Sequence, residues 1–204
     1  MTRKNPYAGP DAQTRRAKAQ GYPARSVFKL EEIDRRVRLF RQGQRVLDLG
    51  AAPGSWSLFA SQKVGAQGRV IAIDLSEILQ VFPPNVTVLR GDALEQLDPR
   101  IAEQGPYDVV LSDMAPNTTG NKTSDQARSF DLFMRAAEVA AELGRPGSAF
   151  VGKLFMSNDF QPARKAVSDR YQKVQTIRPE STRNISSEVF IIGTGLRAGG
   201  PPST

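Results

Sequence analysis

The 204-residue chain contains no cysteine and no histidine. It can therefore form no disulfide, thiol nucleophile or Cys/His zinc site, and it has no histidine general base. Acid–base chemistry falls to Lys, Asp, Glu or Tyr, and we expect no bound metal. The chain also lacks an apolar run long enough to span a bilayer, and its N-terminus lacks the apolar core of a signal peptide. These absences predict a soluble, cytoplasmic protein with one cored domain, and we expect it to be a monomer.

The stretch VLDLGAAPGSW at residues 46–56 organises the rest of the chain. Its apolar run, small residues and helix-like continuation are typical of a buried parallel strand, a tight turn and a helix start, as in nucleotide-binding α/β domains. Asp48 and Gly50 stand at the strand's carboxyl end, where ligands bind in open parallel sheets. Gly54 lets backbone N–H groups approach a ligand closely. A pyrophosphate binder would carry G-x-G-x-x-G here, and this chain does not.

Three further apolar runs, at residues 70–74, 86–90 and 108–113, end in or are followed by an acid: Asp74, Asp92 and Asp113. Asp74 lies 24 residues after Gly50, close to the spacing at which an acid meets a ribose hydroxyl pair. One acid at a strand end is ordinary helix capping, but three in succession favour a ligand-binding edge.

Hydrophobic periodicity predicts the remaining elements. Helices are expected at residues 25–38, 123–143 and 159–171, the second beginning in a capping box, TSDQ, at residues 123–126. Strands are expected at residues 149–155, 174–177 and 188–194. The last two are joined by a loop too short for a crossover helix, so they should pair antiparallel. The predicted fold is a doubly wound, Rossmann-like α/β domain with a mostly parallel seven-stranded sheet and one antiparallel edge strand, a methyltransferase-like variant.

Positive charge is concentrated near the N-terminus. The net charge is +7, and residues 1–45 hold 12 Lys/Arg against 4 Asp/Glu, whereas the remainder holds 16 against 17. A basic segment beside a cofactor-type fold favours contact with a polyanion, the alternative being a solubilising tail. Composition predicts a flexible basic arm over residues 1–22, a domain over residues 23–196 and a disordered tail over residues 197–204.

Two lysines and an acid complete the candidate site. Lys153 interrupts an apolar strand, where a buried lysine is rare unless it is paired or functional; the alternative is a side chain that reaches out to water. Lys29 lies at the edge of a helical apolar stripe, where a solvated lysine is expected. Glu188 begins the last strand, where an ordinary solvent-facing start is the alternative. If the four groups Lys29, Asp113, Lys153 and Glu188 converge, they form a proton-transfer site without histidine.

Four segments resemble the FtsJ/RrmJ family of S-adenosylmethionine-dependent RNA ribose 2′-O-methyltransferases: RSxFKL at residues 25–30, DLGAAPGxWS at 48–57, SDMAPN at 112–117 and SEVF at 187–190. The resemblance extends from about Ser26 to Gly195. It implies that the family's catalytic tetrad falls on Lys29, Asp113, Lys153 and Glu188. It implies cofactor contacts at Gly54, Trp56, Asp74, Asp92 and Asp113.

Two positions depart from the family pattern. Ser55 replaces a glycine of many members, and its hydroxyl is expected to cap the following helix. Gly152 stands where a β-branched residue is common, and we expect it to loosen the strand locally.

The resemblance implies methyl transfer from S-adenosyl-L-methionine to a uridine 2′-OH of large-subunit ribosomal RNA. Transfer RNA and messenger caps remain alternative substrates. Lys153 can act either as a neutral base or as a charged group that orients the hydroxyl. A nicotinamide oxidoreductase is disfavoured by the broken glycine pattern. A non-catalytic RNA-binding module is disfavoured because all four tetrad positions are present. An amino-directed methylase would carry an Asn/Asp-Pro-Pro-aromatic motif after the fourth strand.

Overall fold

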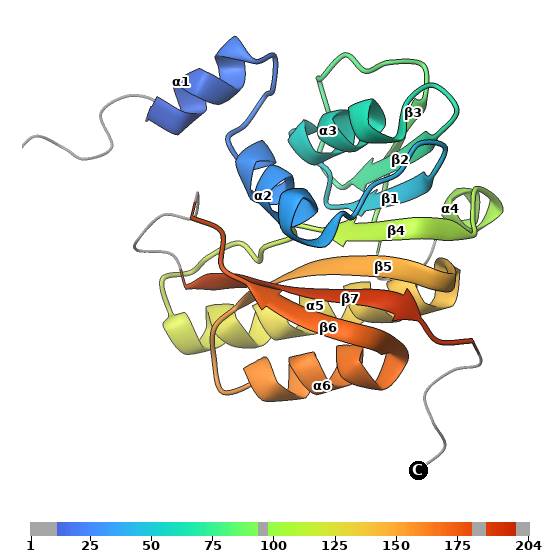
Figure 1. Ribbon diagram of the computed structural model, residues 1–204. Coiled ribbons are helices and arrows are strands. Elements are labelled where there is room, and N and C mark those ends of the chain that lie inside the picture. Colours follow the sequence, from blue (N-terminus) through green and yellow to red (C-terminus); the bar gives the residue numbers. More distant parts are fainter. Residues whose placement is uncertain (1–11, 94–97, 181–186, 199–204) are drawn as a thin grey trace, which may run out of the picture.

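Seven β-strands form one sheet in the computed structural model, which describes residues 12–93, 98–180 and 187–198. The strands are β1 (Arg45–Leu49), β2 (Arg69–Asp74), β3 (Val86–Arg90), β4 (Tyr107–Ser112), β5 (Gly144–Phe155), β6 (Tyr171–Ile177) and β7 (Glu188–Leu196). Their order across the sheet is β3-β2-β1-β4-β5-β7-β6 (Figure 1). The first strand, β1, lies inside the sheet, and the later strands are added on both sides of it.

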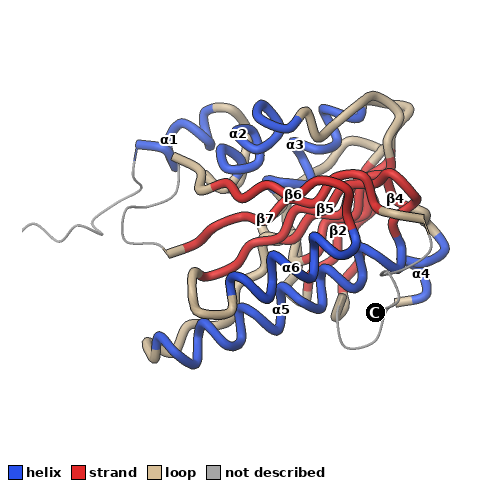
Figure 2. The backbone as a smooth tube through the Cα atoms, turned by 60° about the horizontal axis from the view of Figure 1, so that its bottom comes forward, coloured by secondary structure: helices blue, strands red, loops and turns tan. Residues whose placement is uncertain are grey.

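Helices cover both faces of the sheet (Figure 2). The helices α1 (Ala12–Ala19), α2 (Val27–Val37) and α3 (Ser55–Val64) lie on one side, and α4 (Pro99–Glu103), α5 (Lys122–Leu143) and α6 (Phe160–Arg170) lie on the other. Each face has its own apolar cluster. Among the helices of the described ranges, none combines the length and apolar character needed to cross a bilayer.

The alternation of side chains along each strand decides which residues meet. On β1, Val46 belongs to the cluster under α2 and α3, whereas Leu47 and Leu49 belong to the cluster under α5 and α6. Because successive side chains point to opposite faces, Asp48 projects to the α2–α3 side. On β5, Val151 packs on that side, so Lys153, two residues later, projects there as well.

The predicted mostly parallel sheet with antiparallel pairing at one edge is confirmed. The reversed strand is β7, which pairs antiparallel with both β5 and β6, so that β6 forms the edge itself. The register sets Lys153 opposite Phe190 and Phe155 opposite Glu188. The start of β7 therefore lies beside the carboxyl end of β5.

The predicted flexible arm is wrong for residues 12–22. Residues Ala12–Ala19 form α1, and Ala17 is completely buried. The guanidinium of Arg16 lies 4.6 Å from the ring centroid of Phe28, and Arg25 Nη1 donates to Gln13 Oε1 at 3.2 Å. Long-range contacts of this kind leave no local apolar pattern. Residues 1–11 of the predicted arm lie outside the described residues.

The predicted disordered tail is wrong at its beginning. The backbone N–H of Arg197 donates to the Arg170 carbonyl at 2.9 Å, and its Nη2 donates to the Tyr171 carbonyl at 3.1 Å. These bonds extend the pairing of β6 and β7 by one residue. Residues 199–204 of the predicted tail lie outside the described residues.

Gly152 does not loosen β5; the packing of two aromatic rings requires it. A Cβ at this position would lie 2.5 Å from Phe150 Cζ and 2.6 Å from Phe133 Cε2. The two ring centroids are 5.6 Å apart, and both side chains are buried. The glycine therefore makes room for an aromatic pair from β5 and α5 directly beside Lys153.

Candidate active site

The turn between β1 and α3 has the backbone that the sequence predicted. Gly50 and Gly54 have φ angles of 73° and 107°, which favour glycine. A Cβ on Gly54 would lie 2.8 Å from Phe82 Cζ. A small pocket beside this turn is lined by Ser26, Asp48, Gly50, Ala51, Ala52, Pro53, Ser55, Trp56 and Asp113. Residues from three separate segments thus meet in one place, and two of these segments carry predicted site residues.

Ser55 begins α3 in helical conformation, so its position needs no glycine. Its hydroxyl accepts from the Ala24 N–H at 2.8 Å and donates to the Ala24 carbonyl at 3.1 Å. The expectation that this hydroxyl caps α3 is wrong, because no side-chain cap is made at this end. The serine instead ties α3 to the segment that leads into α2.

Trp56 makes a second tie to the same segment. Its indole N–H donates to the Ser26 carbonyl at 2.9 Å, and its ring centroid lies 5.7 Å from that of Phe190. The side chain is almost completely buried. Trp56 therefore joins α2, α3 and β7 in a wall of the pocket.

Asp74 and Asp92 lie at adjacent strand ends. Asp74 accepts from the Ala52 N–H at 2.9 Å and from the Ser76 N–H at 2.7 Å, which fixes its orientation. The Gly91 N–H donates to the Asp74 carbonyl at 3.0 Å, so Asp92 follows immediately beside it. Both acids are half-buried. Each oxygen of a carboxylate can accept more than one hydrogen bond, so Asp74 keeps capacity for a ligand.

Asp48 is the buried acid of the site, with 1% of its surface exposed. Ser57 Oγ donates to Asp48 Oδ2 at 2.5 Å. Burial is the main cause that raises the pKa of Asp48 to about 7; the charges of Asp113 and Asp74 also raise it, and the Ser57 hydrogen bond opposes the shift. Asp48 lies beneath the turn as a carboxyl group that titrates near neutrality.

Lys153 is paired and buried, with 7% of its surface exposed. Its Nζ lies 2.9 Å from Asp113 Oδ1 and donates to the Asp113 carbonyl at 2.5 Å. One hydrogen bond and one ion pair to the same residue therefore hold the ammonium where the chain leaves β4.

The expectation of a solvated Lys29 is wrong. Its Nζ lies 2.5 Å from Glu188 Oε1, and only 12% of its side chain is exposed. The same ammonium is 5.8 Å from the ring centroid of Phe190, which faces Lys153 across the β5–β7 pair. Glu188 is two residues from Phe190, so the two Lys–carboxylate pairs share one face of the sheet.

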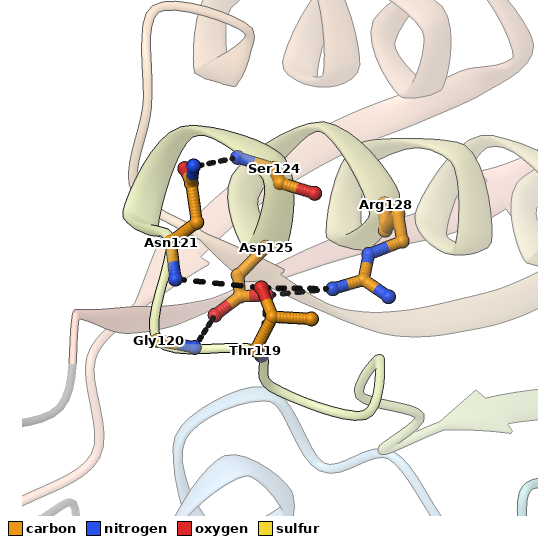
Figure 3. A network of polar contacts seen from close by, with 6 residues as sticks. All are labelled: Thr119, Gly120, Asn121, Ser124, Asp125 and Arg128. Atoms are coloured by element: carbon orange, nitrogen blue, oxygen red, sulfur yellow. Dashed lines mark hydrogen bonds and ion pairs between the residues drawn. The ribbon is translucent and has the colours of Figure 1, made fainter.

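A polar network fixes the loop that leaves Asp113 (Figure 3). Asp125 accepts from the Thr119 N–H and hydroxyl, both at 2.9 Å, and Arg128 Nη2 donates to it at 2.7 Å. The hydrogen bond from the Thr119 N–H is the main cause that lowers the pKa of Asp125. The predicted capping box is wrong by two residues, because Asn121 caps α5 by accepting from the Ser124 N–H at 3.2 Å.

Sequence reasoning missed the contacts by which three serines support the site. Ser26, Ser55 and Ser57 bond to Trp56, Ala24 and Asp48, partners that lie 9 to 31 residues away. Ser57 could have been found from the sequence, because its hydroxyl lies near the start of the helix that follows the strand of Asp48. No local signal indicated the contacts of Ser26 and Ser55 with their distant partners. Within the described ranges, no group of three or more Asp or Glu side chains is placed to hold a metal ion.

Solved structures of other proteins share the fold of this chain. A putative ribosomal RNA methyltransferase from Plasmodium falciparum has a TM-score of 0.75 at 22% identity, covering 86% of this chain and 98% of that chain. Fibrillarin from Aeropyrum pernix, with natively bound S-adenosyl-L-methionine, has a TM-score of 0.55 at 15% identity, covering 76% and 67%. The fold is that of the Rossmann-like methyltransferases.

The chain belongs to the FtsJ-like methyltransferase family, whose profile matches residues 22–196. It is 61% identical over 197 residues to the ribosomal RNA large subunit methyltransferase E of Sorangium cellulosum, covering 97% of this chain and 93% of that protein. It is 48% identical to the protein of the same name from Oleidesulfovibrio alaskensis, covering 89% of each. The chain is therefore a methyltransferase.

Proposed function

We propose that the chain transfers a methyl group from S-adenosyl-L-methionine to a ribose 2′-OH of large-subunit ribosomal RNA, as a cytoplasmic monomer. The observation that carries the proposal is the convergence of the Lys153–Asp113 and Lys29–Glu188 pairs on one face, beside the acid-ended strands. The curated relatives named for large-subunit methylation support the substrate.

The residues at the strand ends fit the cofactor. The backbone at Gly54 forms a surface that a side chain would fill, since a Cβ there would press on Phe82. Asp74 is oriented to accept from a ribose hydroxyl pair, and Asp92 beside it can accept from the adenine amino group. Asp113, together with Asp48 in its ionised form, supplies negative charge for a cationic ligand. When bound, the cofactor supplies a methyl group on a positively charged sulfur.

The chain's own residues position the hydroxyl and handle its proton. The 2′-oxygen forms a bond to the methyl carbon as the carbon–sulfur bond breaks, and the hydroxyl proton must leave. Lys153 Nζ donates a hydrogen bond to the Asp113 carbonyl and is ion-paired with Asp113 Oδ1, so a tetrahedral position remains for the substrate. In the charged form that position carries an N–H that steadies the developing alkoxide. In the neutral form it carries a lone pair that accepts the proton.

The basic segment fits the RNA side of the reaction. Residues 1–45 carry the charge surplus, and α1 and α2 lie on the sheet face that holds both ion pairs (Figure 2). Arg15 and Lys18 are exposed on α1. Because α1 is anchored by the buried Ala17, its cations have a defined position relative to Lys29.

Replacement of Lys153 tests the proposal. Lys153→Ala should lower methyl transfer to large ribosomal subunits by at least 10²–10⁴-fold, because both proton handling and positioning are lost. Labelled cofactor, with identification of the modified nucleoside, provides the assay, and cofactor affinity should be unchanged. Lys165→Ala is the matched control, since Lys165 pairs with Asp169 on the surface of α6.

Lys153→Arg separates the two roles. Arginine donates hydrogen bonds but does not lose its proton, so substantial residual activity indicates the charged role and loss indicates the base. Near-normal turnover by Lys153→Ala, or a product methylated away from the 2′-oxygen, contradicts the proposed function.

A further inference from the structure

A polar cavity of about 270 Å³ lies on the α2 side of the sheet, away from both ion pairs. Its base is formed by β5, β6 and β7, and the turn that follows α2 forms its rim. The residues that carry the argument are Arg38, Arg41, Lys173, Asp108, Ala149 and Thr194. This cavity shares no lining residue with the pocket at the β1–α3 turn.

The cavity lies within reach of a substrate held at the candidate active site. Ala149, in its lining, is four residues before Lys153 on the same face of β5, about 13 Å at the rise of a strand. Val37, also in the lining, is eight residues after Lys29 on α2, about 12 Å at the rise of a helix. The distances along β5 and along α2 thus place the cavity about equally far from Lys153 and from Lys29.

The cavity lining carries excess positive charge. Within the described parts of the chain, the side chains of Arg38, Arg41 and Lys173 make no ion pair or hydrogen bond. Asp108, the acid of the lining, is already engaged: Oδ2 accepts from the Arg45 N–H at 2.7 Å, and Oδ1 lies 3.2 Å from Arg145 Nε. Three cations are therefore available to an anion.

Arg38 occupies a backbone position that favours glycine. It ends α2 with φ 52°, and its N–H donates to the Asp34 carbonyl at 2.7 Å. Among the described residues, it is the non-glycine residue with positive φ. A glycine would close the helix with less strain, so the chain keeps this guanidinium at a cost in stability. Strain of this kind is characteristic of functional positions.

We propose that this cavity binds a backbone phosphate of the RNA substrate, about 13 Å along β5 from Lys153. The inference rests on the proposed function and adds a second anchoring point to it. The lining contains no aromatic side chain on which a base could stack. A phosphate contact therefore positions the strand without reading its sequence.

The test compares cation removal inside and outside the cavity. Arg38→Ala, Arg41→Ala and Lys173→Ala, singly and together, are compared with Arg35→Ala, which removes an exposed cation of α2 outside the cavity. Affinity for large-subunit RNA is measured against salt in the full-length protein. The triple variant should bind several-fold to tens of fold more weakly. Its salt slope should become shallower, by about 0.7 for each phosphate that the variant no longer neutralises. Cofactor affinity should be unchanged.

Arg38→Gly gives an independent readout. It should unfold at a higher denaturant concentration than the wild type while it loses RNA affinity as Arg38→Ala does. If Arg38 has only a structural role, Arg38→Gly should raise stability without changing RNA affinity. That result overturns the inference. So does an Arg35→Ala variant that weakens binding as much as the cavity variants.

Two further results separate this inference from the proposed function. Wild-type protein that binds no ribosomal RNA contradicts the proposed function itself. Wild-type protein that binds RNA, together with a triple variant that binds it equally, contradicts the cavity alone. Uridine monophosphate is the probe for a small ligand: if it binds the cavity tightly and RNA does not displace it, the site serves a free nucleotide and the inference is overturned.

Discussion

Asp48→Asn should change how the stability of the protein depends on pH. Burial raises the pKa of Asp48 from 3.8 to about 7, whereas the unfolded chain keeps the ordinary value. Between these pH values the folded state binds one more proton than the unfolded state. The free energy of unfolding of the wild type should therefore fall as pH rises from about 4 to about 7, and this contribution should then level off. Asparagine does not titrate, so the variant lacks this decline.

The size of the effect follows from the two pKa values. One pKa unit corresponds to about 1.4 kcal/mol, so the difference corresponds to about 4 kcal/mol as an upper limit. Chemical denaturation at pH 5, 6, 7 and 8 samples about 3 kcal/mol of that range. The variant should gain stability relative to the wild type over these steps. Ser57→Ala is the matched control, because it removes the hydrogen bond that favours the ionised carboxylate and should extend the decline to higher pH.

Parallel pH profiles for wild type and Asp48→Asn would refute this reasoning, because they would mean that Asp48 ionises in the fold as it does in water. The pH dependence of cofactor affinity is a second test of how the Asp48 carboxyl group ionises. A cation held near Asp48 favours the ionised carboxylate, so cofactor affinity should rise with pH through 7 in the wild type. The variant should show no such rise.

Two further substitutions test contacts beside the site. Gly152→Ala should destabilise the protein by about 1–3 kcal/mol in denaturant titrations, because its Cβ meets the Phe133 and Phe150 rings; Phe133→Leu in the same chain should recover part of the loss. An unchanged denaturation midpoint would show that the Phe133 and Phe150 rings shift to make room for the methyl group without loss of stability. Ser55→Ala should cost about 1–3 kcal/mol and slow methyl transfer, because the Ala24 N–H loses its partner in the segment before Lys29. Ser61→Ala, which loses a hydrogen bond within α3, is its control, and equal activities would contradict the role of the Ser55 tie.

The sheet and the long helices could be predicted from the sequence because their signals are local. Apolar runs with acidic ends marked β1, β2 and β4, and helical periodicity marked α2 and α5. α4 was missed because its five residues carry too few apolar positions for a period. Its start was nevertheless encoded, since Asp98 accepts from the Arg100 N–H at 2.9 Å and Pro99 opens the helix.

Contacts between distant segments could not be predicted from local patterns. α1 has a single buried residue, Ala17, and it is held by contacts with residues 25–28 that no pattern within α1 reveals. Gly152 suggested weakness in the strand until the positions of Phe133 and Phe150 were known. The residue types at Lys29 and Glu188 were visible in the sequence, but their ion pair depends on how α2 docks against β7.

The reversal of β7 explains why the site can include its first residue. In a parallel sheet, the first residue of every strand lies at the edge opposite the ligand-binding edge. β7 runs antiparallel to β5, so Glu188 faces Phe155 at the carboxyl end of β5, near Lys153. A parallel β7 would carry Glu188 to the other edge, and Lys29 would lose its partner. The antiparallel strand is therefore part of the active-site architecture, since it turns a strand start into a neighbour of the strand ends.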